Sequence, residues 1–269
     1  MQLTPRHDIL LRQVNLKPLA SPQSMLASAF REFTGVRLVD DDGESCVLEF
    51  LPPATPDEIA KLEAELPSPL PVEIREALQL SKGFLNGPLE SFSLLDYGQF
   101  GMDDVFPYAH SIGHDGFGNY WVLDLLPDST SWGPVFFACH DPPVIAYQCE
   151  TVEQFFRDVV AMWQPGAPRS PVDEVHDDFV NRIWNTNPGV TSQVEASASR
   201  DAVLAGFASG FPANAVFVDL RSPSPGQGFS WGRYGPRTTW VRHGHERLWA
   251  TIPPTKPPSL LSRFFHGAS

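Results

Sequence analysis

The sequence predicts an α+β fold, in which a twisted, mainly antiparallel sheet packs against helices and a small α+β module is added at the C-terminal end. The chain has 269 residues, of which 42% are hydrophobic and 12% aromatic, enough to bury a real core. Element signals follow the order helix, hairpin, two helices, strand block and closing helix, which is typical of α+β proteins. The connections within the strand block are too short for repeated crossover helices, so the strands are predicted to be antiparallel.

The helices before the strand block carry clear start signals. Ser21-Pro22 begins a short helix toward Phe33, with proline at the first helical position. Thr55-Pro-Asp-Glu58 is a capping box that begins the second helix. Pro71 begins the third, which is predicted to stop at Gly83.

The strands are predicted from short β-rich runs between turn residues. Residues 36–50 form a hairpin around Asp41-Asp42-Gly43. Between residues 92 and 147 lie the runs SFSLLDY, YWVLDLL, PVFFA and PVIAYQ. Thr151 then begins a helix whose apolar stripe must lie on the sheet. The stripe consists of Val152, Phe155, Phe156, Val159, Val160 and Trp163.

A proline-rich segment divides the chain. Three prolines and a glycine within Gln164–Pro171 break helix and strand continuity, so residues 1–163 are predicted as one domain, 164–171 as a linker and 172–269 as an accessory module with a Pro-rich tail. Residues 1–170 hold 10 Lys/Arg and 24 Asp/Glu, a net charge of −14, whereas residues 171–269 hold 9 and 8, a net charge of +1. All of the acidity therefore belongs to the first part.

The C-terminal module has its own element signals. Helices are predicted over 172–185 and 201–209, and strands over 215–220, 229–231, 238–241 and 247–252. These strands form either a second sheet or an extension of the first. The tail begins with Pro253-Pro-Thr-Lys-Pro-Pro258, an extended polyproline segment. Whether the apolar residues that follow, Leu260, Leu261, Phe264 and Phe265, dock on the body stays open.

Three segments carry a resemblance to a known family. They are Ala54–Glu63 with Leu70–Leu78, Phe106–Ala109 with Gly113–Asp124, and Gly133–Phe137 with Thr151–Phe156. In order and spacing, residues 50–163 resemble the SUKH superfamily, the Smi–Knr family of bacterial immunity proteins and fungal cell-wall regulators. One departure is that the usual Asn-Gly after the second helix is displaced to Asn86-Gly87.

The resemblance implies a SUKH-like sheet and a protein that binds other proteins. By this resemblance the chain is a non-enzymatic immunity protein that binds and neutralises a cognate bacterial toxin, a nucleic-acid-acting or other cationic toxin domain of a polymorphic toxin system. The alternative is an intracellular scaffold or regulator, as the fungal members suggest. Neither function requires a cofactor or a metal.

Charge and targeting signals agree with such a partner. The net charge of −13 disfavours direct binding to nucleic acid or to an anionic membrane and favours a cationic protein. The N-terminal stretch lacks the apolar segment of a signal peptide, and no run reaches the length of a membrane span. Three cysteines do not form a disulfide framework. We therefore expect a cytoplasmic protein.

Acidic residues in loops, together with nearby aromatic residues, are the candidate partner-binding surface, because carboxylates steer a cationic partner and aromatic rings anchor it. The candidates are Asp103, Asp104, Asp115, Tyr120, Trp121, Asp141 and Glu150, with Tyr97, Tyr108 and Trp132 as further aromatic residues. Gly116 and Gly118 are expected to adopt positive φ in a tight turn before a strand.

Patterns that suggest catalysis or metal binding have weaker support. His110 and His114 are four residues apart, but the intervening sequence argues against a helix, so they are interpreted as surface or turn residues. Cys139 and Cys149 complete no zinc pattern. Arg242-His243-Gly244 looks like the nucleophile motif of histidine phosphatases, but too little chain follows it for the rest of that domain.

Overall fold

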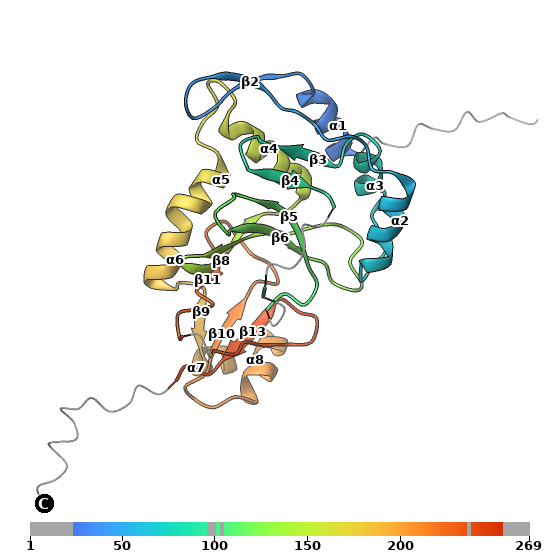
Figure 1. Cartoon of the computed structure of the whole chain (residues 1–269). Coiled ribbons are helices and arrows are strands. Elements are labelled where there is room, and N and C mark those ends of the chain that lie inside the picture. Colours follow the sequence, from blue (N-terminus) through green and yellow to red (C-terminus); the bar gives the residue numbers. More distant parts are fainter. Residues whose placement is uncertain (1–23, 96–100, 103–104, 236–237, 255–269) are drawn as a thin grey trace, which may run out of the picture.

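The structure is a computed structural model that describes residues 24–95, 101–102, 105–235 and 238–254 (Figure 1). The first part contains α1 (Met25–Phe33), β1 (Arg37–Val39), β2 (Ser45–Val47), α2 (Pro56–Glu65), α3 (Val72–Leu78), β3 (Gly83–Leu85), β4 (Ser91–Ser93), β5 (Ala109–His114), β6 (Tyr120–Asp124), β7 (Val135–His140), β8 (Pro143–Cys149) and α4 (Val152–Met162). It is followed by α5 (Pro171–Glu174), the π-helix η1 (Val175–Phe179), α6 (Val180–Thr186), β9 (Val190–Ser192), α7 (Gln193–Ser197), α8 (Ala202–Ser209), β10 (Val216–Asp219), β11 (Gly228–Phe229), β12 (Val241–Arg242) and β13 (Leu248–Thr251). The predicted α+β class is confirmed.

Local signals placed most helix ends correctly. The predicted capping box of Thr55 is present at the start of α2. The predicted helix start at Ser21-Pro22 lies outside the described residues, and α1 begins at Met25, where the Ser24 side chain accepts a hydrogen bond from the Ala27 amide. The end of α3 was predicted wrongly, because the helix stops at Leu78. Gly83 instead lies in β3 with φ +137°, and the Phe92 backbone occupies the space that a Cβ would need.

The main sheet has seven antiparallel strands in the order β11-β8-β7-β6-β5-β4-β3. The four predicted runs correspond to β4, β6, β7 and β8, whereas β3 and β5 were missed. β3 has three residues, and β5 has the polar sequence AHSIGH. Their pairing with neighbouring strands, which sequence periodicity does not report, makes them strands.

Both faces of the main sheet are buried. Alternate residues of β7 show the division: Phe137 packs into the core beneath the helices, and Phe136 packs into a second core on the other face. The stripe of α4 predicted from the sequence lies on the first face, with Phe155 and Phe156 fully buried. A two-sided sheet explains why these strands read as nearly continuous apolar runs.

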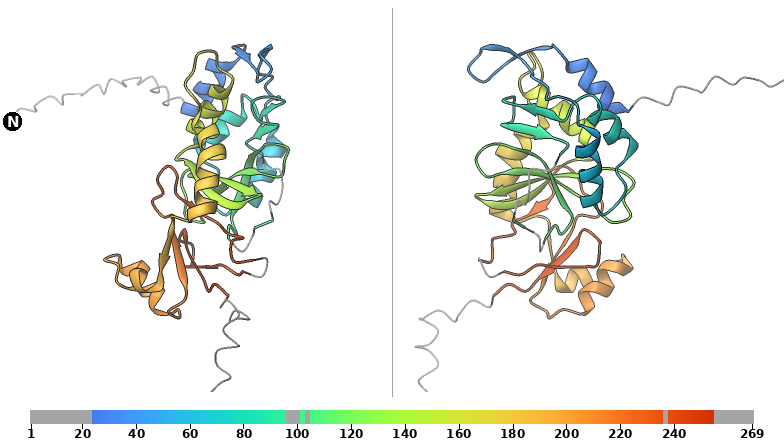
Figure 2. Two further views of the ribbon diagram at one scale, coloured as in Figure 1. Left: turned by 90° about the vertical axis from the view of Figure 1, so that its left-hand side faces the viewer. Right: turned by 45° about the vertical axis from the view of Figure 1, so that its right-hand side comes forward.

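The C-terminal region forms a second antiparallel sheet, β12-β13-β10-β9, which lies below the main sheet in both views (Figures 1 and 2). Of the two arrangements left open, the described chain uses both, because β11 extends the main sheet while the other strands build the second one. Trp249 and Phe229 pack in the same core as Phe136 and Ile145. The division at residues 164–171 stays a prediction.

No helix in the described ranges has both the length and the apolar character needed to cross a bilayer.

Candidate partner-binding surface

Three hairpin turns of the main sheet lie at the same end of its strands. Because β3–β4, β5–β6 and β7–β8 are successive antiparallel hairpins, their turns all fall on the same side. We call this surface the turn edge and define it as residues 86–90, 115–120 and 140–142. It contains Asp115, Tyr120 and Asp141 of the predicted set.

The turn at residues 115–119 is shaped by its own aspartate. Asp115 Oδ1 accepts hydrogen bonds from the amides of Phe117 (2.8 Å) and Asn119 (3.2 Å). Gly116 and Gly118 have φ of +79° and +92°, which confirms the predicted tight turn. The turn presents Phe117 to solvent with 80% of its surface exposed.

Neighbouring turns are tied together by hydrogen bonds. Asn119 Oδ1 accepts from the His140 amide (3.0 Å), which links the turn of β5–β6 to that of β7–β8. Burial raises the pKa of the Cys139 thiol; a hydrogen bond with the Asp141 backbone opposes this, and the charges of Asp115 and Asp141 add to it. These two predicted residues therefore belong to one surface.

A third carboxylate and a shallow hollow complete the turn edge. The Glu90 side chain lies beside Gly116, where an added Cβ would be 3.6 Å from it. Half-buried Tyr120 lines a hollow of about 110 Å³ with His140 and Trp231. The arrangement offers an exposed aromatic ring among carboxylates, which suits a protein partner with a basic surface.

Other predicted residues lie elsewhere. Glu150 follows the far end of β8, where its carboxylate accepts a hydrogen bond from Tyr147 Oη (3.4 Å), so it is not part of the turn edge. Trp121 is 2% exposed and its Nε1 donates to Gln148 (3.1 Å), which corrects its assignment as a surface anchor. Trp132 is buried as well. Asp103, Asp104 and Tyr97 lie outside the described residues.

Sequence reasoning missed Phe117, the most exposed large apolar side chain of the turn edge. A phenylalanine between two glycines in a predicted tight turn cannot turn into the core, since the turn tip points away from the sheet. That pattern was a usable signal for an anchor.

The Arg-His-Gly motif has a structural role. All five N–H groups of Arg242 are donated within the chain: to both carboxylate oxygens of Asp124 (3.0 and 2.6 Å) and to the carbonyls of Val105, His245 and Glu246. The Arg242 side chain is only 6% exposed, and that of Asp124 is 0% exposed. No donor remains for a phosphoryl group, and the His243 ring packs on Phe207.

Arg247 completes this buried group. Its Nε donates to Asp124 Oδ2 (3.1 Å), and its Nη2 donates to the Asp124 carbonyl (2.9 Å). We call Asp124, Arg242 and Arg247 the ionic joint, because the aspartate ends β6 of the main sheet and the arginines belong to the second sheet region. Burial lowers the pKa of Arg247, opposed by the charge of Asp124.

His110 is a correction to the sequence interpretation. It is 4% exposed in β5, and its Nε2 lies 3.1 Å from the Leu94 carbonyl, so it is a core residue and not a surface one. Cys139 and Cys149 are buried and unpaired. Among the residues that the structure describes, no three His, Cys, Asp or Glu side chains converge as metal ligands would.

The fold and the turn edge define an α+β protein with a rigid sheet that presents an acidic, aromatic surface. In a comparison with known families, residues 53–158 match the model of the SMI1 / KNR4 family (SUKH-1). The resemblance inferred from the sequence is thereby confirmed for this segment, which is SUKH-like. No curated protein and no solved structure matches the chain.

Proposed function

We propose that this chain is a non-enzymatic immunity protein that binds a cationic toxin in the cytoplasm and neutralises it by covering it with the turn edge. The observation that carries the proposal is the 80% exposed ring of Phe117, on a turn fixed by Asp115 and with the Glu90 side chain beside Gly116. The family match over residues 53–158 supports a protein-binding role.

The two kinds of side chain contribute differently to binding. An aromatic ring on a pre-formed turn loses little conformational freedom on association, so it is suited to be the anchor. Glu90, Asp115 and Asp141 add long-range attraction, and residues 1–170 as a whole carry a net charge of −14. We therefore expect the carboxylates to govern the association rate and Phe117 the dissociation rate.

The test uses a toxin encoded beside the gene, purified with its activity measurable. Phe117→Ala is expected to weaken toxin binding by about tenfold or more and to reduce inhibition in parallel. Val72→Ala is the matched control, because Val72 is also a highly exposed apolar residue (71%) and lies on α3, away from the turn edge. Equal loss in both variants, or none in either, would contradict the proposed surface.

Salt and charge variants test the electrostatic part. The association rate of the wild type should fall as ionic strength rises, and Glu90→Gln with Asp141→Asn should flatten that dependence. An association rate that does not respond to salt would contradict the electrostatic role of the carboxylates, but not the role of Phe117 as the anchor.

An intracellular scaffold or regulator is the second candidate, and the same family match supports it. It predicts that the turn edge binds partners without toxic activity. Co-expression separates the two, since only an immunity protein restores growth to cells that produce the toxin.

A further inference from the structure

An apolar groove lies on the second sheet, where the helical layer ends. The face of this sheet turned away from the main sheet is covered by α7 and α8, which bury Phe217 and Ala250 against Ala196 and Ala208. The cover stops before β12. Val241 and Ile252, at that end of the same face, remain 46% and 51% exposed.

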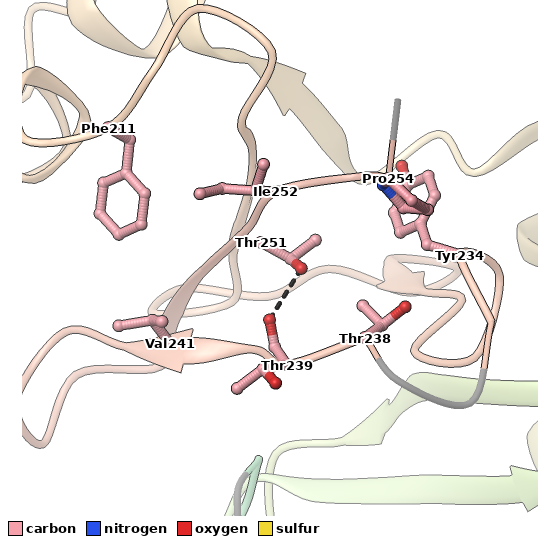
Figure 3. A pocket seen from close by; sticks show the side chains of 8 residues that line it. All are labelled: Phe211, Tyr234, Thr238, Thr239, Val241, Thr251, Ile252 and Pro254. Atoms are coloured by element: carbon pink, nitrogen blue, oxygen red, sulfur yellow. Dashed lines mark hydrogen bonds between the residues drawn. The ribbon is translucent and has the colours of Figure 1, made fainter. Parts of the chain in front are cut away.

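These side chains form the floor of a cavity of about 320 Å³ (Figure 3). Phe211 stands on one side of it and Tyr234 with Pro254 on the other, as the close-up shows. The Thr251 hydroxyl donates its hydrogen to the Thr239 carbonyl (2.8 Å), so it does not offer that hydrogen to an occupant of the groove. Among the described residues that line the groove, none has a charged side chain, so the groove fits an apolar occupant.

The position of the groove in the chain indicates which occupant. Pro254 is both a wall residue and the last described residue before the C-terminal segment 255–269. The chain is held at this point, since Asn214 Nδ2 donates to the Pro253 carbonyl (3.5 Å). The segment TKPPSLLSRFFHGAS thus starts at the groove.

The segment also has the required chemistry. Its apolar residues Leu260, Leu261, Phe264 and Phe265 recur at i, i+1, i+4 and i+5, the spacing of one helix face. We propose that this apolar set packs into the groove between Phe211 and Pro254 and completes the layer that α7 and α8 begin. This inference does not depend on the proposed function.

Because segment 255–269 is covalently attached beside the groove, even a weak contact between the two is occupied for much of the time. Five residues lie between Pro254 and Leu260, which allows a reach of about 20 Å from the groove wall. A short tether gives an effective concentration of roughly millimolar. A contact with a Kd of about 0.1 mM between separate molecules is therefore about nine-tenths occupied within one chain, which corresponds to about tenfold protection. A second copy is the poorer occupant, because it brings another net charge of −13.

The experiment compares two full-length variants by hydrogen exchange. Leu261→Asp with Phe264→Asp places charges on the apolar set, and exchange of the amides over 248–252 is expected to rise by about tenfold or more. Ser259→Asp with Ser262→Asp adds the same charge beside that set and should leave exchange unchanged. Unchanged exchange in the first variant overturns the proposal.

A peptide of residues 255–269 supplies the reciprocal test. It should bind the full-length Leu261→Asp, Phe264→Asp variant, whose groove is free, and bind wild type at least about tenfold more weakly, because the tethered segment competes. Val241→Asp in that variant should abolish peptide binding. Equal binding to wild type, or a wild-type dimer by light scattering that the first variant loses, would overturn docking within the chain.

Discussion

At the turn edge, Asp115 and Asp141 keep their carboxylates in contact with solvent, and Asp115 bonds only to its own turn. At the other end of the strands of the same sheet, Asp124 is fully buried and bonded to Arg242 and Arg247. A solvated carboxylate costs little to keep charged and stays available to a partner. A desolvated one persists only if cations and donors replace its water. Aspartate is thus solvated in the surface that we propose for partner binding, and desolvated where it joins the two sheets.

The comparison teaches where this protein tolerates change. Removing a carboxylate from the turn edge should alter recognition with little effect on the free energy of unfolding. Removing the one in the ionic joint leaves two buried guanidinium groups without their counterion. The predictions below test this contrast, beginning with the largest expected effect.

Asp124→Asn is expected to lower the free energy of unfolding by roughly 3–5 kcal/mol, because breaking a buried pair leaves uncompensated charge. Chemical denaturation of the full chain measures it. Asp128→Asn, an exposed neighbour, is the control and should change stability by less than about 0.5 kcal/mol. Similar values for the two variants would show that the ionic joint contributes no more than a surface carboxylate.

Gly118→Ala tests whether backbone conformation shapes the turn edge. Its φ of +92° is unfavourable for alanine, and the added Cβ would lie 3.3 Å from the His140 ring. We expect a loss of about 1–2 kcal/mol in thermal unfolding. Gly206→Ala in α8 is the control of opposite sign: its Cβ would meet nothing within 4 Å, and a helical alanine should gain about 0.5–1 kcal/mol. A loss in both variants would remove the conformational argument.

Asp158 sharpens the contrast, because it is a carboxylate partly buried without a cation. Burial, and then the charge of Glu153, raises its pKa from 3.8 to about 6. Its contribution to stability is therefore fully present below pH 3.8, where both states hold the proton, and is lost as pH rises through about 6.

The Asp158→Asn substitution removes the loss of stability that ionisation of Asp158 causes at high pH. At pH 7.5 the variant should be more stable than wild type by about 1 kcal/mol, after allowance for solvent screening of a half-buried group, and the advantage should disappear near pH 4. Urea unfolding at both values measures it. A constant difference between wild type and variant across this range would contradict the raised pKa.

The elements that sequence analysis predicted correctly depend on neighbouring residues. Thr55 with Glu58, and Thr151 before the stripe of α4, set their helices through contacts three or four residues away. Sequence analysis missed β3 and β5 in the main sheet and β9 and α7 in the C-terminal region. β3 and β5 are short or polar, and they are strands because other strands pair with them. The same division separates Asp115, predicted as exposed, from Trp121, whose burial depends on the helices above the sheet.

The sequence by itself determined the α+β class, the SUKH-like segment, the turn around Gly116 and Gly118 and the acidity of the first part, because each follows from composition or from contacts within a few residues. Only the tertiary structure decided that Asp141 joins Asp115 while Glu150 does not, and that Arg242 is bonded to Asp124, 118 residues away. Periodicity reports which side of an element faces the core. Which elements meet is decided by packing over the whole chain.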